Sequence, residues 1–302
     1  MNGMTACAWV ALAFGGFVFC MAEEVHPVIA PGAVVEKLAD GFLFTEGATC
    51  DPQGNVFFVD QPNNRIHKWS VEGGLSTFMD PAGRANGMCF DKKGMLFVCA
   101  DEKNELLEVS PDGKVTVLAR THEGHVLNGP NDVFAHPGGA LYFTDPFYKR
   151  PWWEHTEMPQ SSQQVYRLSP DRKQLVRVTD NLEKPNGIIG TPDGKRLYVA
   201  DMAAKKTHVY DIQTDGSLAN QTLFCEMGSD GMTIDDEGNV YLTGDGVIVF
   251  DKSGRQIARI EVPEKWAANV CFGGQDRKTL FITASKGFYR VKTRFRGANP
   301  GK

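Results

Sequence analysis

The sequence predicts an all-β protein, a six-bladed β-propeller with a metal site in its central channel. Two observations predict this fold. A turn followed by a run of large apolar residues recurs six times along the chain, and a residue with a side-chain oxygen precedes each turn by about five positions. Repeats of this size match four-stranded blades arranged around an axis.

Each repeat combines a turn that contains Gly or Asp with β-branched and aromatic residues, a pattern typical of a β-hairpin. The six copies begin at Asp51 (DPQGNVFFVD), Asp91 (DKKGMLFVCA), His136 (HPGGALYFTD), Thr191 (TPDGKRLYVAD), Asp235 (DDEGNVYLTG) and Gly273 (GGQDRKTLFITA). No stretch shows a sustained helical period. The segment 33–39 (AVVEKLA) has no hairpin partner in the first repeat. We expect it to complete the last blade beside 287–291, because an open edge strand invites aggregation.

The N-terminal segment differs from the repeats. Residues 6–19 form an uncharged apolar run, and the small residues Cys20 and Ala22 follow it, which is typical of a signal peptide cut after Ala22. The segment before the run has no Lys or Arg, unlike most signal peptides. Two alternatives are a transmembrane anchor, for which the run is short, and a lipoprotein cut before Cys20, for which Phe19 is bulky. We expect a signal peptide over 1–22 and a secreted or periplasmic protein.

Composition bounds the remaining chain. Of 302 residues, 42% are hydrophobic, enough for a full core, so we expect one propeller domain over 23–302. The net charge of −5 and the lack of a basic cluster exclude a nucleic-acid partner, and no membrane contact is expected beyond the leader. An odd number of cysteines follows the leader, beside apolar runs, and we expect buried free thiols. These are Cys50, Cys89, Cys99, Cys225 and Cys271.

The polar residues before the turns form the candidate site. Each begins the innermost strand of its blade, so all six converge on one end of the channel. We call these six residues the ring; they are Glu46, Asn86, Asn131, Asn186, Asp230 and Asn269. Carboxylate and amide oxygens suit Ca²⁺ better than Mg²⁺, and the absence of His or Cys from the ring disfavours Zn²⁺. The alternative is a wet polar channel that binds no metal.

Several motifs carry a family resemblance. They are NNRIHKW (63–69), GRANGM (83–88), LNGPNDV (127–133), LYFTDP (141–146), PNGI (185–188) and SDGM (229–232). Together, over about 34–291, they resemble the gluconolactonase branch of the senescence-marker-protein/regucalcin-like family. The resemblance implies a six-bladed propeller with one divalent cation in its channel and hydrolysis of a sugar lactone. Ca²⁺ is expected first, with Mg²⁺, Mn²⁺ or Zn²⁺ as alternatives in activity.

The resemblance also assigns roles to residues. The implied metal ligands are Glu46, Asn186 and Asp230, with Asn131 at a fourth position that contacts metal or substrate. The Arg usual before Leu-Asn in the third motif is Val126 here, which leaves the substrate preference open. The further candidates for substrate contact are Asn86, Asn128 and His125.

Lactone opening requires a carboxylate that takes a proton from water. Asp230 is the first candidate, because it would lie beside both metal and substrate. Asp145 is the second, with a structural role as a turn former before Pro146 as its alternative. No Gly-x-Ser-x-Gly elbow, phosphate loop or dinucleotide fingerprint is present, which argues against serine-hydrolase and nucleotide chemistry.

Three other functions stay open at this point. The ring could hydrolyse an organophosphate ester, or the chain could be a non-catalytic Ca²⁺-stabilised binding propeller. A sugar dehydrogenase would require an added redox cofactor. The third repeat contains a longer segment, 147–164, with Trp152 and Trp153, which could cover the channel mouth and contact substrate or a partner.

Overall fold

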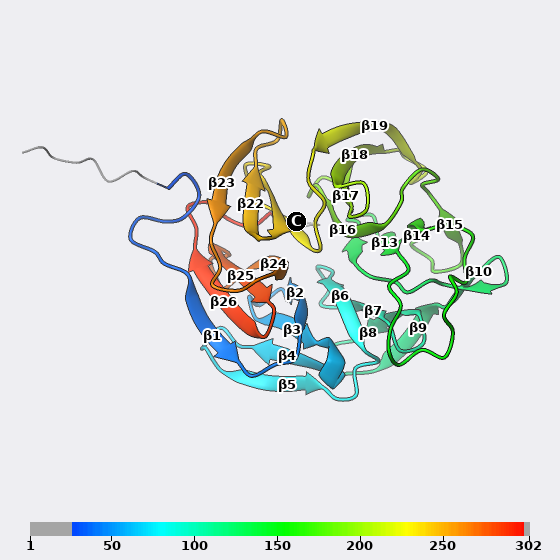
Figure 1. The fold of residues 1–302 in the computed structure, drawn as a ribbon, viewed down its shortest axis with the longest axis horizontal. Helices are drawn as coiled ribbons and strands as arrows, with labels where there is room; N and C mark the ends of the chain where they lie inside the picture. Colours follow the sequence, from blue (N-terminus) through cyan, green and yellow to red (C-terminus); the bar gives the residue numbers. More distant parts are fainter. Residues whose placement is uncertain (1–25, 299–302) are drawn as a thin grey trace, which may run out of the picture.

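Six four-stranded antiparallel sheets surround a central channel (Figure 1), so the predicted all-β propeller is confirmed. The structure, a computed structural model, describes residues 26–298. The leader predicted for residues 1–22 lies outside them. A short hairpin of β10 (Thr121–His122) and β11 (His125–Val126) and a 3-10 helix, η1 (Gln61–Asn63), complete the described elements. No helix within these residues is long and apolar enough to span a membrane.

The blades follow the chain in order, and each is given from its inner to its outer strand. Blade 1 contains β2 (Thr45–Cys50), β3 (Val56–Asp60), β4 (Arg65–Trp69) and β5 (Leu75–Met79). Blade 2 contains β6 (Ala85–Phe90), β7 (Leu96–Ala100), β8 (Glu105–Val109) and β9 (Val115–Ala119). Blade 3 contains β12 (Val133–Ala135), β13 (Leu141–Asp145), β14 (Gln164–Leu168) and β15 (Leu175–Arg177).

The second half of the ring has the same order. Blade 4 contains β16 (Pro185–Gly190), β17 (Arg196–Asp201), β18 (Lys206–Ile212) and β19 (Leu218–Cys225). Blade 5 contains β20 (Met232–Ile234), β21 (Val240–Gly244), β22 (Gly246–Phe250) and β23 (Gln256–Ile260). Blade 6 contains β24 (Ala267–Gly273), β25 (Thr279–Ala284), β26 (Gly287–Lys292) and β1 (Glu36–Asp40).

The propeller closes at blade 6 as the sequence predicts, although the first strand covers 36–40 rather than 33–39. The strand β1 pairs antiparallel with β26, with Glu36 opposite Arg290, and so completes blade 6 from the N-terminal side. Their side chains form an exposed ion pair with an Nη2–Oε2 distance of 2.8 Å. Blade 6 therefore contains both the first and the last strand of residues 26–298.

The turn of each repeat joins the inner strand to the second strand. In blade 1 the Asp51 carboxylate accepts hydrogen bonds from the backbone N–H groups of Gln53 and Asn55, at 3.0 and 2.8 Å. Asp side chains favour such turns because they replace a backbone acceptor. Asp91 and Asp235 accept the equivalent backbone N–H groups in blades 2 and 5, which explains why Asp recurs at this turn position.

The hydrophobic core lies between neighbouring blades. Phe57 and Val59 of blade 1 pack with Leu96 and Val98 of blade 2, and comparable clusters fill the other interfaces. At the closing interface the fully buried Phe288 stacks on Phe58, with ring centroids 4.2 Å apart. The cysteines are buried or half-buried, and all five are free thiols within the described residues, as expected.

Candidate active site

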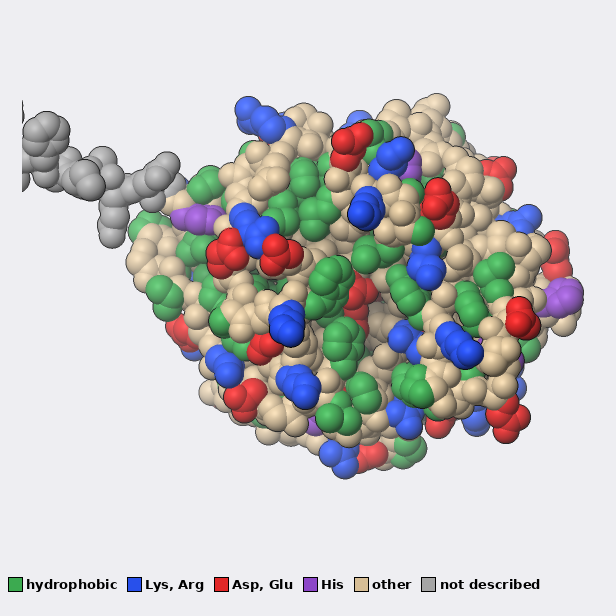
Figure 2. Space-filling view, in the orientation of Figure 1, with side chains coloured by type: hydrophobic (Ala, Val, Ile, Leu, Met, Phe, Trp, Pro, Cys, Tyr) green, Lys and Arg blue, Asp and Glu red, His purple; other side chains and the backbone are tan. Residues whose placement is uncertain are grey.

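All six predicted ring residues lie at the channel end of an inner strand. Glu46, Asn86, Asn186 and Asn269 lie within β2, β6, β16 and β24, while Asn131 and Asp230 precede β12 and β20 by two residues. Five of the side chains are buried, and that of Asp230 is half-buried. On the face seen in Figure 2, the centre is hollowed, with acidic side chains in the hollow and Lys and Arg around it.

Glycine after a ring residue allows the strands to approach closely. A Cβ atom on Gly47, whose φ is +58°, would overlap the carbonyl oxygen of Asn86. A Cβ atom on Gly87 would overlap the carboxylate of Asp132. The third repeat has Asp132 where the first two have glycine, so Gly87 leaves the space that this carboxylate fills.

Asp230 is held by two donors from different blades. The Asn186 Nδ2 group donates to its Oδ1 at 2.9 Å, and the Trp266 indole Nε1–H donates to its Oδ2 at 2.8 Å. Both hydrogen bonds favour the ionised carboxylate, yet burial dominates and raises the pKa of Asp230. The carboxylate therefore has a fixed orientation at the channel mouth.

Glu46 lies beside Asp230, and the two carboxylates repel each other when both are charged. Burial raises the pKa of Glu46 well above its usual value, and the Asp230 charge raises it further. The backbone N–H of Gly47 donates to the Glu46 carboxylate and opposes the shift. Two neighbouring carboxylates, one buried and one half-buried, are stabilised as a charged pair only by a nearby positive charge.

The donor set of the ring fits a hard cation. The side-chain oxygens of Asn86 and Asn186 are buried and accept no hydrogen bond within the described residues. No three His, Cys, Asp or Glu side chains converge between residues 26 and 298, so ring oxygens beyond the two carboxylates come from amides. Unpaired amide oxygens beside two carboxylates match the oxygen ligands that Ca²⁺ prefers.

The long third-repeat loop forms one wall beside the ring. The Arg150 Nε–H donates to the buried Asp101 Oδ2 at 2.6 Å, and the Trp153 indole donates to the Asp101 carbonyl oxygen at 2.5 Å. The guanidinium of Arg84 lies 4.6 Å from the ring centroid of Trp152. The aromatic pair therefore packs the loop onto blade 2, and the half-buried rings leave only part of their surface for a ligand.

Tyr148, in the same loop, reaches the ring itself. Its hydroxyl oxygen accepts a hydrogen bond from Asn186 Nδ2 at 3.1 Å. Burial raises the pKa of Tyr148 to about 12, so the phenol is protonated at neutral pH.

Asp145 and Asn128 occupy a buried network under this loop. The Asp145 carboxylate accepts the backbone N–H groups of Asn128 and Gly129, at 2.9 and 2.8 Å, and burial raises its pKa to about 7. Asp60 and Asp201 accept paired backbone N–H groups at the equivalent strand ends of blades 1 and 4. The side chain of Asn128 bonds the carbonyl groups of Asp145 and Ser162 and the N–H of Gln160.

His125 lies farther out, in the hairpin strand β11. Its side chain is exposed, and its carbonyl oxygen accepts a hydrogen bond from Gln160 Nε2 at 3.0 Å. Asn128 is hydrogen-bonded to the loop residues Gln160 and Ser162, and the exposed His125 is bonded to the same loop through its carbonyl group. Neither side chain is bonded to a ring residue within residues 26–298. Their contact with substrate stays a prediction.

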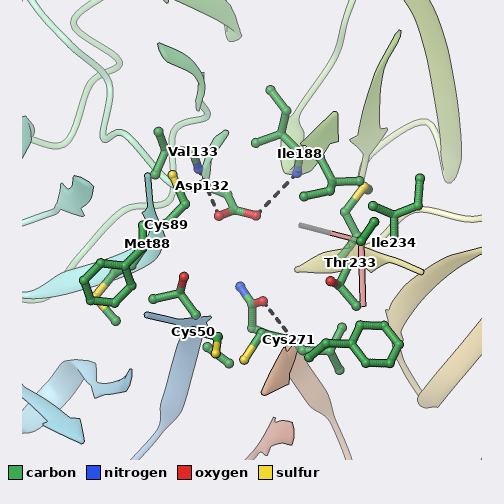
Figure 3. Close-up of a pocket in the computed structure, with 18 of the residues that line it drawn as sticks. Cys50, Met88, Cys89, Asp132, Val133, Ile188, Thr233, Ile234 and Cys271 are labelled. Atoms are coloured by element: carbon green, nitrogen blue, oxygen red, sulfur yellow. Dashed lines mark hydrogen bonds between the residues drawn. The ribbon is translucent and has the colours of Figure 1, made fainter. Parts of the chain in front are cut away.

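A cavity of about 160 Å³ opens from the channel at its other end. Asp132 points into it (Figure 3), and its carboxylate accepts the backbone N–H groups of Val133 and Ile188 at 2.9 and 3.3 Å. Burial raises the pKa of Asp132 to about 8. The thiols of Cys50, Cys89 and Cys271 line the same cavity.

Sequence reasoning missed Tyr148, Trp266 and Asp132. Asp132 had a signal, because it replaces the glycine that follows the ring residue in four other repeats. Tyr148 lies in the predicted insertion 147–164, where Trp152 and Trp153 were the candidates for ligand contact. Trp266 precedes the sixth ring residue in a loop with no repeated pattern.

The fold and the site define a six-bladed β-propeller with an oxygen-lined channel, and the comparisons with known proteins give its family. The chain belongs to the family described as SMP-30/Gluconolactonase/LRE-like region, whose model matches residues 44–286. This confirms the resemblance found in the motifs.

Individual relatives agree with this assignment. The gluconolactonase of Zymomonas mobilis is 31% identical over 97% of this chain and 88% of its own length. The pentonolactonase of Haloferax volcanii is 25% identical, over 80% of this chain and 81% of its own. The solved gluconolactonase of Xanthomonas campestris superimposes with a TM-score of 0.82 at 27% identity, covering 88% of this chain and 91% of that one.

Proposed function

We propose that this protein hydrolyses sugar lactones with a divalent cation bound at the ring. The observation that carries the proposal is the carboxylate pair Glu46 and Asp230 beside the Asn186 oxygen, which accepts no hydrogen bond within residues 26–298. The names of its relatives, gluconolactonase and pentonolactonase, support a sugar lactone as the substrate class.

Glu46, Asn186 and Asp230 would hold the cation, with Asn131 as a fourth ligand. The two carboxylates balance the charge of one divalent ion, and Ca²⁺ fits this oxygen set. When bound, such a cation supplies Lewis acidity that polarises a carbonyl group.

The protein's own residues prepare the reaction. Asn186 and Trp266 orient the Asp230 carboxylate, which takes a proton from the attacking water. The water oxygen bonds to the lactone carbonyl carbon, the ring C–O bond breaks, and the ring oxygen gains a proton, giving the open hydroxy acid. Asp145 is disfavoured as the base because it is fully buried, whereas Asp230 is half-buried at the channel mouth. Its paired backbone N–H contacts also recur at Asp60 and Asp201, which indicates a structural role.

Proton release from a panel of aldonolactones tests the proposal. The purified protein is assayed with EDTA and then with Ca²⁺, Mg²⁺, Mn²⁺ or Zn²⁺ restored. Turnover should depend on metal, be lost in Asp230→Asn and be retained in Asp180→Asn, which changes an exposed carboxylate. Metal binding without turnover on any lactone would refute the proposal and favour a binding propeller. Turnover on phosphate esters alone would favour the organophosphatase alternative.

A further inference from the structure

Tyr148 places a phenol at the ring from outside the repeat pattern. It lies three residues beyond the end of β13, in the long loop of blade 3. Asn186 donates from one amide nitrogen to the Tyr148 hydroxyl at 3.1 Å and to Asp230 at 2.9 Å. The phenol oxygen therefore lies next to the candidate ligand Asn186 and close to the candidate base.

The Tyr148 hydroxyl has a donor to spare. A phenol has one O–H donor, and its oxygen here is the acceptor in the contact with Asn186. Within residues 26–298, no group accepts a hydrogen bond from the Tyr148 O–H. Because Asn186 approaches the oxygen as a donor, this O–H is free to meet an acceptor that enters the channel mouth.

Two cationic side chains fix the Tyr148 ring. The Lys184 Nζ lies 4.7 Å from the ring centroid, and the Arg150 guanidinium carbon lies 5.6 Å from it. Arg150 is itself held by the buried Asp101. Cation–π contacts and a buried ion pair thus position the phenol before any ligand arrives, and a preorganised donor stabilises developing charge better than a mobile one.

We propose that Tyr148 is a further catalytic residue, whose O–H donates a hydrogen bond to the carbonyl oxygen of the bound lactone. This inference rests on the proposed function. Negative charge develops on that oxygen when water attacks the carbonyl carbon, so the hydrogen bond strengthens in the transition state. The phenol keeps its proton throughout, and the ring oxygen still receives the proton released by the water.

The test compares Tyr148→Phe with Tyr142→Phe. The control removes another buried phenol, which donates to the Gly216 carbonyl oxygen at 2.7 Å in the outer part of blades 3 and 4. With glucono-δ-lactone as substrate, Tyr148→Phe should reduce kcat by about a hundredfold, the effect of losing one oxyanion donor, with a small change in KM. Calorimetric titration with CaCl₂ should give the same Ca²⁺ affinity as wild type within about twofold. Tyr142→Phe should retain both kcat and Ca²⁺ affinity.

Three results would overturn the inference, and they are distinguishable. A kcat for Tyr148→Phe within threefold of wild type, roughly the scatter of a neutral change, would show that the O–H takes no part. A parallel loss of Ca²⁺ affinity and kcat would make Tyr148 only a positioning residue for Asn186. A wild-type protein that binds Ca²⁺ but opens no lactone would refute the proposed function and this inference with it.

Discussion

The side-chain amide of Asn186 donates to the Asp230 carboxylate across 2.9 Å and so joins blade 4 to blade 5 at the channel mouth. The contact leaves the Asn186 oxygen without a partner among residues 26–298. One amide therefore orients a carboxylate with its nitrogen and offers its oxygen to a ligand. This double use explains why an amide, rather than a second acid, suits this position.

Replacing Asn186 with Ala should weaken cation binding. The change removes one candidate ligand oxygen and one donor to Asp230, so we expect at least a tenfold loss of Ca²⁺ affinity, which is about 1.4 kcal/mol. Calorimetric titration of the metal-free protein measures it. Asn181→Ala is the matched control, since Asn181 is exposed and its side-chain amide donates to Gln221 on the surface. Equal affinity in the two variants would contradict the assignment of Asn186.

Glu46→Gln should be at least as stable as wild type without metal and less stable than wild type with Ca²⁺. Because burial and Asp230 raise the pKa of Glu46, the contribution of Glu46 to the stability of the metal-free fold is fully present only below its unfolded-state pKa of about 4.3. That contribution is lost as pH increases through the folded-state pKa of Glu46. The variant mimics protonated Glu46, so at about pH 8 its metal-free Tm should equal or exceed that of wild type.

With Ca²⁺ at a hundred times Kd, wild type should gain about 2.7 kcal/mol and the variant much less. Thermal unfolding with EDTA and with CaCl₂ checks both halves, with the exposed Glu237→Gln as control. A calcium-dependent increase in Tm that is equal in Glu46→Gln and wild type would exclude Glu46 as a ligand.

Ca²⁺ binding should release protons and strengthen with pH. Because the pKa values of Glu46 and Asp230 are raised, the metal-free pair keeps a proton at pH values above about 4, where ordinary carboxyl groups are ionised. A cation must displace it. Calorimetry from about pH 6 to pH 8, in two buffers of different ionisation enthalpy, measures the proton release. Identical binding heats in both buffers would contradict this expectation.

Asp145→Ala should destabilise the fold before it affects chemistry. The change strands two buried backbone N–H groups, of Asn128 and Gly129, at a cost of about 2 to 4 kcal/mol. Urea unfolding measures it against Asp193→Ala, which changes an exposed turn. A variant of normal stability that binds Ca²⁺ but does not turn over would instead favour Asp145 as the base.

Phe288→Ala should open the interface between blades 6 and 1. Phe288 is fully buried and stacks on Phe58 and Phe281, so its truncation should reduce the free energy of unfolding by about 3 to 5 kcal/mol. The half-exposed Phe78→Ala should lose much less. Comparable losses in the two variants would show that this interface contributes no more than the surface.

The fold could be predicted from the sequence because blades repeat their chemistry. The turn residues Asp51, Asp91 and Asp235 accept hydrogen bonds from equivalent backbone N–H groups in blades 1, 2 and 5, so the repeat can be recognised in the sequence. The ring could be predicted for the same reason, since equivalent residues of a radial repeat meet at the axis. Segment 33–39 could be assigned to blade 6 because it was the one strand-like segment without a hairpin partner.

The contributions of Tyr148 and Trp266 could not be predicted in this way. Each reaches Asn186 or Asp230 from a loop with no counterpart in the other repeats, so its contact depends on how that loop packs. Asp145 shows the converse difficulty. Its motif suggested chemistry, whereas its two backbone acceptor contacts recur at Asp60 and Asp201 as part of the repeated architecture.

The pairing of β1 with β26 affects the order in which the protein can fold. Glu36 of β1 pairs with Arg290 of β26. During synthesis β1 is therefore made early, and the partner residue in β26 is made only 254 residues later. During that interval its backbone is an unpaired edge that other chains could join. A chain that stops before Gly287 would lack β26, so its first strand would have no partner and the propeller would not close.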